Sequence, residues 1–273
     1  LIVLHGANGA GKTNVLEAVS LLSPGRGLRG AKMAEIQSQD TPKGAGTPWA
    51  VAAQVQTEYG LVQVGTGLEP SGDKRLIRVN GENVRGQAAL AEYVACVWLT
   101  PQMDRLFIDS ASHRRRFLDR LVFGFDPGHS GRVSRYENAM RQRSKLLQEG
   151  GADASWLDSL EAQMAETGTA IAAARLDFAQ RLQSACLAAE NAHFPTAHLA
   201  VHGTLEGVLA SATALEVEEM FTYALKDSRV RDALTGGAAT GPHKSDLLVH
   251  YIAKDMAADQ CSTGEQKALL IGI

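Results

Sequence analysis

The residues best suited to chemistry stand in a glycine-rich run near the start of the chain. The run has the G-x-x-x-x-G-K-[ST] spacing of a phosphate-binding (Walker A) loop, after an apolar run and before a helical pattern. Glycines let backbone N–H groups approach phosphate oxygens, and a helix N-terminus adds its dipole. Lys12 would reach the β- and γ-phosphates, and the Thr13 hydroxyl would hold Mg²⁺. The predicted nucleotide-binding residues are Gly6, Ala7, Asn8, Gly9, Ala10, Gly11, Lys12, Thr13 and Asn14.

A second motif, far along the sequence, is also able to hold an anion. A serine and a glycine form a tight turn there, directly before an apolar helical pattern. The same residues would equally suit an ordinary helix cap. Because two phosphate cradles this far apart cannot grip one phosphate, they predict a composite site shared by two subunits related by two-fold symmetry. The residues predicted to act across this dimer are Ser262, Thr263, Gly264, Glu265 and Gln266.

The carboxylates that a P-loop ATPase uses for hydrolysis are not found in the sequence. No apolar run ends in the Asp-Glu pair that would assist Mg²⁺ and polarise water. We therefore predict no catalytic residue, and expect the chain as given to bind nucleotide weakly without hydrolysing it. Leu1 already stands in a predicted strand and Ile273 in a helical pattern, so we expect a fragment of a longer protein.

Overall charge does not predict a nucleic-acid-binding protein, because the formal net charge is −3. Cations nevertheless gather locally, in an arginine triplet at residues 114–116 and in the segment 132–145. Each cluster taken alone would also suit a solvated helix face. The candidate contacts to DNA or phosphate are Arg29, Arg114, Arg115, Arg116 and Lys244.

Cysteine usage and hydropathy indicate a cytoplasmic protein without a membrane partner. The three cysteines are isolated and form no C-x-x-C pair, which fits a reducing compartment. No run approaches the ~20 apolar residues needed to span a bilayer.

Hydrophobic periodicity predicts an α/β organisation for the first part of the chain. A strand over residues 1–5 leads through the phosphate loop to a helix over 13–22, with Val15, Leu16, Val19 and Leu22 as its buried stripe. A loose stretch to about residue 48 precedes three strands, at 49–56, 61–67 and 75–79. Asn80-Gly81 signals a hairpin that completes an antiparallel β-subdomain. A further buried strand is expected at 93–99.

The middle of the chain is predicted to be helical. Helices are expected from Ser110 onward, over 133–148 and over 155–192, followed by a strand at 198–203. A helix over 215–234, with Leu234 buried, precedes a strand at 247–252 and the helix after Ser262. We predict three regions: 1–109 and 196–273 as the two parts of an ATPase lobe, and 110–195 as an inserted helical arm.

Five sequence blocks resemble the RecF family of DNA replication and repair proteins. The loop and the residues after it, through Asn14 and Glu17-Ala18, resemble those of SMC- and RecF-type ATPases. The other matching blocks are Thr100-Pro101-Gln102-Met103-Asp104 with Arg114-Arg115-Arg116-Phe117-Leu118-Asp119, Tyr136 through Gln142-Arg143-Ser144-Lys145-Leu146-Leu147, Thr240-Gly241-Pro242-His243-Lys244-Ser245-Asp246, and Ser262–Gln266.

The resemblance implies a P-loop NTPase of the ABC/SMC type, with an antiparallel β-subdomain and an inserted helical arm. It implies ATP and Mg²⁺ as cofactors, an ATP-dependent homodimer and binding of single-stranded and gapped DNA. RecO- and RecR-type partners would help it load recombinase. By the same resemblance, Ser262 and Gly264 contact the γ-phosphate across the dimer, and Arg114–Arg116 support either that site or DNA. The full-length protein would be a weak, DNA-stimulated ATPase.

The sequence departs from the family pattern at three positions. Gln102 stands where the family has Glu, and either Gln102 or Thr100 would take a Q-loop role. Lys244 replaces an arginine and Ser245 an aspartate, so a bidentate phosphate contact there is lost. Two alternatives remain open: an ABC-type ATPase serving a membrane or other protein partner, and a small-molecule P-loop kinase.

Overall fold

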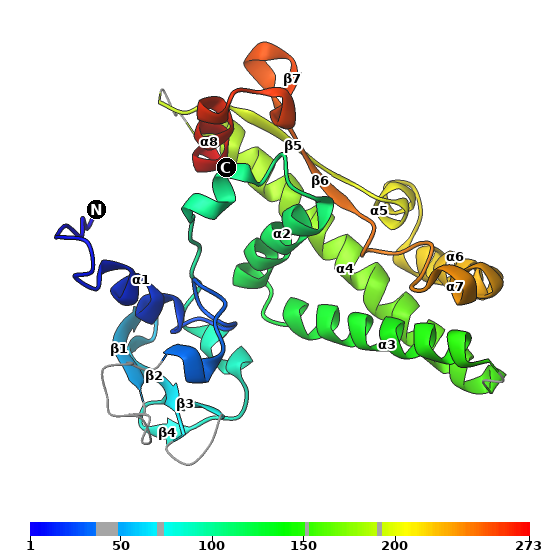
Figure 1. Cartoon of the computed structure of the whole chain (residues 1–273), viewed down its shortest axis with the longest axis horizontal. Coiled ribbons are helices and arrows are strands. Elements are labelled where there is room, and N and C mark those ends of the chain that lie inside the picture. Colours follow the sequence, from blue (N-terminus) through cyan, green and yellow to red (C-terminus); the bar gives the residue numbers. More distant parts are fainter. Residues whose placement is uncertain (37–48, 70–73, 151–152, 190–192) are drawn as a thin grey trace. The chain divides into compact units, whose positions relative to one another are not determined.

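The computed structural model describes residues 1–36, 49–69, 74–150, 153–189 and 193–273 (Figure 1). Residues 37–48 of the predicted loose stretch lie outside the described ranges. The chain divides into two compact units, Leu1–Thr100 and Pro101–Ile273, and each is described by itself.

The described residues of the first unit combine the α-helix α1 and two short 3-10 helices with an antiparallel sheet in the order β1-β2-β3-β4. Asn80 and Gly81 take positive φ (49° and 86°), as a two-residue hairpin requires, and Asn80 Oδ1 accepts from the Gln63 N–H at 2.9 Å. The predicted β-subdomain is therefore confirmed. The elements are α1 (Lys12–Ser20), η1 (Met33–Ile36), β1 (Ala50–Thr57), β2 (Gly60–Leu68), β3 (Arg75–Val79), β4 (Glu82–Asn83) and η2 (Gln87–Glu92).

Two predicted strands of this unit are wrong. Residues 1–5 and 93–99 form no strand, because no described segment pairs with either of them. The predicted stripe of α1 is also wrong in part. Val15, Leu16 and Val19 are 50–52 % exposed, whereas Leu22 is buried in a small core with Val64, Ile77 and Leu90. An apolar stripe is buried only where another element covers it, and among the described residues none does.

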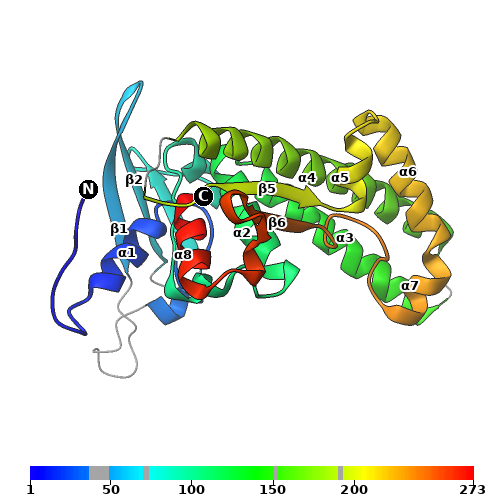
Figure 2. The ribbon, with the colours of Figure 1, turned by 90° about the horizontal axis from the view of Figure 1, so that it is seen from above.

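The second unit is built around long helices and a sheet in the order β5-β6-β7, antiparallel throughout. In both views α3 and α4 run side by side, and β5 lies along α4 (Figure 2). Together the two units show a mixed α/β fold with antiparallel sheets and long helices. The elements are η3 (Pro101–Arg105), α2 (Ala111–Phe125), α3 (His129–Glu149), α4 (Ala154–Ala188), β5 (Ala197–His202), α5 (Thr204–Leu209), α6 (Ala214–Asp227), α7 (Arg229–Thr235), β6 (Asp246–Tyr251), η4 (Ile252–Lys254), β7 (Met256–Ala257), η5 (Ala258–Gln260) and α8 (Thr263–Gly272).

One predicted helix of the second unit is broken in two. The segment predicted as a single helix over 215–234 ends at Asp227, and a second helix starts at Arg229 after the shared cap Ser228. Ser228 Oγ donates to Asp232 Oδ2 at 2.6 Å, which holds the new helix start. The change of direction leaves Leu234 85 % exposed, so its predicted burial is wrong.

A buried ion cluster joins the helices of the arm. Arg143, which has no exposed surface, donates through Nε to Glu161 Oε1 and through Nη1 to Asp232 Oδ2, both at 2.8 Å. Its Nη2 donates to the Leu225 carbonyl at 2.6 Å, and Arg229 bonds Glu161 from the other side. The cluster thus ties α3 to α4, α6 and α7.

Replacing Arg143 by alanine would leave Glu161 and Asp232 buried with fewer partners. Breaking a buried ion pair in this way costs about 3–5 kcal/mol. We expect that loss in the free energy of unfolding, measured by urea denaturation and far-ultraviolet circular dichroism. Arg141→Ala, an exposed change on the same helix, should stay within about 0.5 kcal/mol of the wild type. Equal stability of the two variants would contradict the proposed role of the cluster.

Candidate nucleotide-binding site

The phosphate loop of the first unit turns sharply into helix α1. Gly9 and Gly11 take positive φ (85° and 84°), a conformation that other residues rarely adopt. Gly11 is the N-cap of α1, and its carbonyl accepts from the N–H groups of Asn14 (2.9 Å) and Val15 (3.1 Å). The exposed residues before it, 6–10, therefore lead directly to the helix N-terminus, as phosphate binding requires.

The next two side chains, Lys12 and Thr13, lie in different places: Lys12 contacts the loop, and Thr13 is exposed. Lys12 Nζ donates to the carbonyls of Gly6 (2.7 Å) and Ala7 (2.8 Å), so the ammonium lies against the loop that it is predicted to serve. Thr13 is exposed on the first turn of α1, where a hydroxyl could reach Mg²⁺. These positions suit the predicted roles.

The segment that follows α1 returns along the helix and brings Arg29 near the loop. Arg29 Nη2 donates to Asn14 Oδ1 at 3.1 Å, and its backbone N–H donates to Glu17 Oε2 at 3.0 Å. Glu17 is buried, and Ser20 Oγ accepts from the Leu28 N–H at 2.7 Å. Arg29 is thus the candidate contact that the fold places next to the predicted nucleotide-binding residues.

Arg75, which the sequence gave no reason to single out, holds the other end of α1. Its guanidinium donates to the carbonyls of Leu21, Ser23 (3.2 Å) and Gly25 (2.6 Å), which follow the last turn of the helix. No carboxylate partner is found for it in the described part of the chain, and burial lowers the pKa of Arg75 to about 10. A cation at a helix C-terminus is favourable, so Arg75 stabilises this end of α1 and joins it to β3.

The signature segment, in the second unit, forms a capping box at the start of α8. Ser262 Oγ accepts from the Glu265 N–H (3.4 Å), and Glu265 Oε2 accepts from the Ser262 N–H (2.9 Å). Gln266 points inward and donates to the Cys261 carbonyl at 2.8 Å. Ser262, Thr263 and Gly264 remain exposed at the helix N-terminus. The cap and an anion-binding turn are therefore compatible here.

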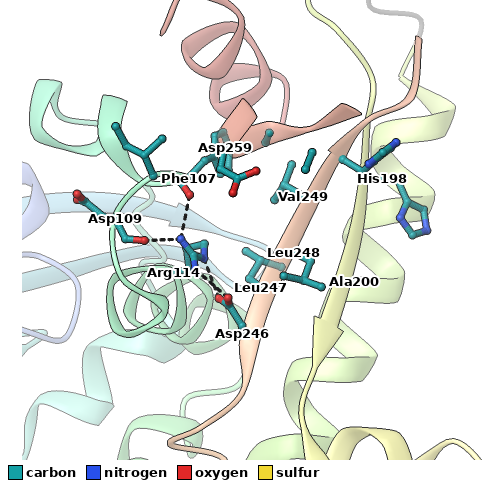
Figure 3. A pocket seen from close by; sticks show the side chains of 14 residues that line it. Phe107, Asp109, Arg114, His198, Ala200, Asp246, Leu247, Leu248, Val249 and Asp259 are labelled. Atoms are coloured by element: carbon teal, nitrogen blue, oxygen red, sulfur yellow. Dashed lines mark hydrogen bonds and ion pairs between the residues drawn. The ribbon is translucent and has the colours of Figure 1, made fainter. Parts of the chain in front are cut away.

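The arginine triplet meets the block Thr240–Asp246 inside the second unit. Arg114 donates to both oxygens of Asp246 (2.7 and 2.8 Å) and to the carbonyls of Phe107 and Asp109 (Figure 3). Arg115 Nη1 donates to the Ser245 carbonyl at 2.6 Å. The hydrogen bond that Arg114 donates to Asp246 raises the pKa of Arg114. These two arginines have structural partners, whereas Arg116 and Lys244 are exposed.

A second connection between these blocks passes through Asp119. Arg175 donates to both oxygens of Asp119 at 2.8 Å and to the Pro242 carbonyl at 2.6 Å, and His129 bonds the same carboxylate. Burial alone would raise the pKa of Asp119, but the hydrogen bonds from His129 and Arg175 hold it below its usual range. The family-like blocks are therefore neighbours in space for a structural reason.

Beside the Arg114–Asp246 pair lies a hollow of about 740 Å³ on the open face of β5 and β6 (Figure 3). His198 and Ala200 line it from β5, and Leu248 and His250 from β6.

Within the described ranges, no group of His, Cys, Asp and Glu side chains is arranged to hold a metal ion. Nor does any described helix combine the length and apolar character needed to cross a membrane.

Comparison with known proteins finds relatives that are similar over the whole of this chain. The chain is 48 % identical over 277 residues to the DNA replication and repair protein RecF of Mesorhizobium japonicum. It is 45 % and 46 % identical to the proteins of the same name from Caulobacter vibrioides and Agrobacterium fabrum. Each alignment covers 100 % of this chain and 72 % of the relative. No family model matches the chain.

Two solved structures share the fold. They are described as the recombination mediator protein RecF-ATPrS and RecF-ATP in the RecFOR pathway. The TM-scores are 0.84 and 0.82, at 22 % identity, over 98 % of this chain and 71 % of each of theirs.

The pKa of Glu265 tests the contacts that this side chain makes in the capping box and with Lys254. The Lys254 ammonium and the Ser262 hydroxyl and N–H stabilise its carboxylate and lower its pKa to about 2. A lowered pKa means that the cap's contribution to stability is present above pH ~4.5 and is lost as the pH falls toward 2. Carboxyl NMR should find Glu265 ionised at about pH 3.5. In Lys254→Met the titration midpoint should move upward. An unchanged midpoint would show that Lys254 is not the cause.

Proposed function

Because the chain belongs to the RecF family of DNA replication and repair proteins, we propose that it is an ATP-switched DNA-binding protein of recombinational repair. In this proposal Mg-ATP binds at residues 6–14, with Lys12 on the β- and γ-phosphates and Thr13 on the metal. The observation that carries the proposal is the phosphate loop, which turns at Gly9 and Gly11 into the N-terminus of α1. The relatives of solved structure are described with ATP-type ligands.

The switch would be the association of two subunits around ATP. In this P-loop NTPase of the ABC/SMC type, the exposed Ser262, Thr263 and Gly264 of one subunit would face the γ-phosphate held by its partner. Glu265 and Gln266 would hold that turn in shape, since both are engaged in the cap of α8. A ligand that binds only the dimer stabilises it by mass action.

The dimer would bind single-stranded and gapped DNA and help load recombinase together with RecR- and RecO-type proteins. Arg29, Arg116 and Lys244 are exposed and available for DNA or phosphate. Arg114 and Arg115 would act mainly by fixing the block that carries Lys244, because both already donate to residues of that block. Such binding is mostly electrostatic and therefore salt-dependent.

Lys12→Ala tests the nucleotide site. Removing the ammonium should weaken binding of a fluorescent ATP analogue with Mg²⁺ by at least about 10-fold, because a charge-assisted phosphate contact is lost. Lys32→Ala, an exposed cation in the same unit, is the matched control and should bind as the wild type does. Equal affinities for Lys12→Ala and the control would exclude the phosphate loop as the ATP site.

Ser262→Arg tests the composite site. The larger side chain should block ATP-dependent dimerisation, measured by sedimentation, and ATP-dependent binding of gapped DNA, measured by fluorescence anisotropy. ATP binding to the single subunit should remain, and Ser211→Arg, on an exposed turn, should dimerise normally. A P-loop kinase would tolerate the Ser262 change, so unchanged dimerisation and DNA binding would refute the ATP sandwich.

A further inference from the structure

Helix α3 presents two faces of opposite character. Its inner face buries Tyr136, Ala139 and Arg143 against the rest of the arm. Its outer face is polar and exposed, and it carries Ser134, Arg135, Asn138, Arg141, Gln142 and Lys145, with the exposed Glu137 at its edge. At 100° per residue these outer positions fall within one third of the helix circumference, so they form a continuous stripe. We call it the outer α3 face.

The cations of the outer α3 face are largely free of carboxylates. Among the residues that the structure describes, neither Arg135 nor Arg141 has an ion-pair partner, and Arg141 donates only to the Asn138 amide. Lys145 has Glu149 at 3.7 Å, but both side chains are well exposed, so this pair is weak. The other arginines of the helix differ, since Arg132 pairs with Asp126 and Arg143 is buried.

The composition of this face fits one kind of occupant. Three cations spread over eleven residues, about 15 Å of helix, and interleaved with amide and hydroxyl groups match a row of phosphates better than a compact anion. No aromatic side chain stands among these residues to stack a base. We propose that the outer α3 face binds the phosphate backbone of double-stranded DNA. This inference rests on the proposed DNA-binding function and adds a surface to it.

The test compares two variants with equal loss of charge. The first replaces Arg135, Arg141 and Lys145 by Gln. The control replaces Arg181, Lys226 and Arg231, which are exposed cations of α4, α6 and α7, by Gln. Thermal unfolding and ATP-dependent dimerisation are measured for both, and neither should change, since all the substituted side chains are exposed.

Binding of a gapped duplex is then measured by anisotropy with Mg-ATP at several salt concentrations. Each lost phosphate contact lowers the slope of log K against log salt by about 0.9. We expect the slope of the α3 variant to fall by about 2–3, with weaker binding at low salt, and the control to keep the wild-type slope.

Three other outcomes would overturn the proposal in distinguishable ways. If the wild type binds DNA and both variants keep its slope, the outer α3 face is not the DNA surface, while the proposed function stands. If the wild type binds no DNA with ATP, the proposed function fails and this inference with it. If the α3 variant loses binding of polyglutamate but not of DNA, the face takes an acidic protein instead.

Discussion

The second unit depends on guanidinium groups that are buried or partly buried and therefore need hydrogen-bond partners within the protein. Arg143, Arg175 and Arg114 each reach from one helix to carboxylates and carbonyls of segments far away in the sequence. A buried charge without partners costs several kcal/mol, so these contacts leave few alternatives for how α2, α3 and α4 meet the returning chain at residues 237–246. The apolar cores provide most of the driving force, and the arginines determine which segments meet.

The same chemistry appears in the first unit with a different partner. Arg75 is bonded to backbone carbonyls and not to carboxylates, and these carbonyls follow the end of α1. At the opposite end, Gly9 and Gly11 give the loop its turn, and Glu17 and Ser20 hold the segment that carries Arg29. The proposed nucleotide site is thus one end of a helix whose other end is fastened to a sheet.

Much of the fold could be predicted from local signals. The hairpin at Asn80-Gly81 and the apolar periodicity of α4 are each encoded within a few residues or turns, and these two predictions were confirmed. Whether residues 1–5 and 93–99 form strands could not be predicted from their local sequence, because a strand forms only where a neighbouring strand pairs with it. Arg75 and the Arg143 cluster were missed for the same reason, since the Gly25 carbonyl lies 50 residues from Arg75 and Asp232 lies 89 residues from Arg143. The roles of Lys12, Thr13 and Ser262 stay predictions.

The attachment of Arg75 has a mechanical consequence. These hydrogen bonds couple the C-terminal end of α1 to β3, so we expect a displacement of the phosphate loop to move the helix and the sheet together. Because this connection uses carbonyls and a guanidinium, its strength is insensitive to acid. Helix α1 therefore connects the phosphate loop at its N-terminal end to the β-sheet at its C-terminal end.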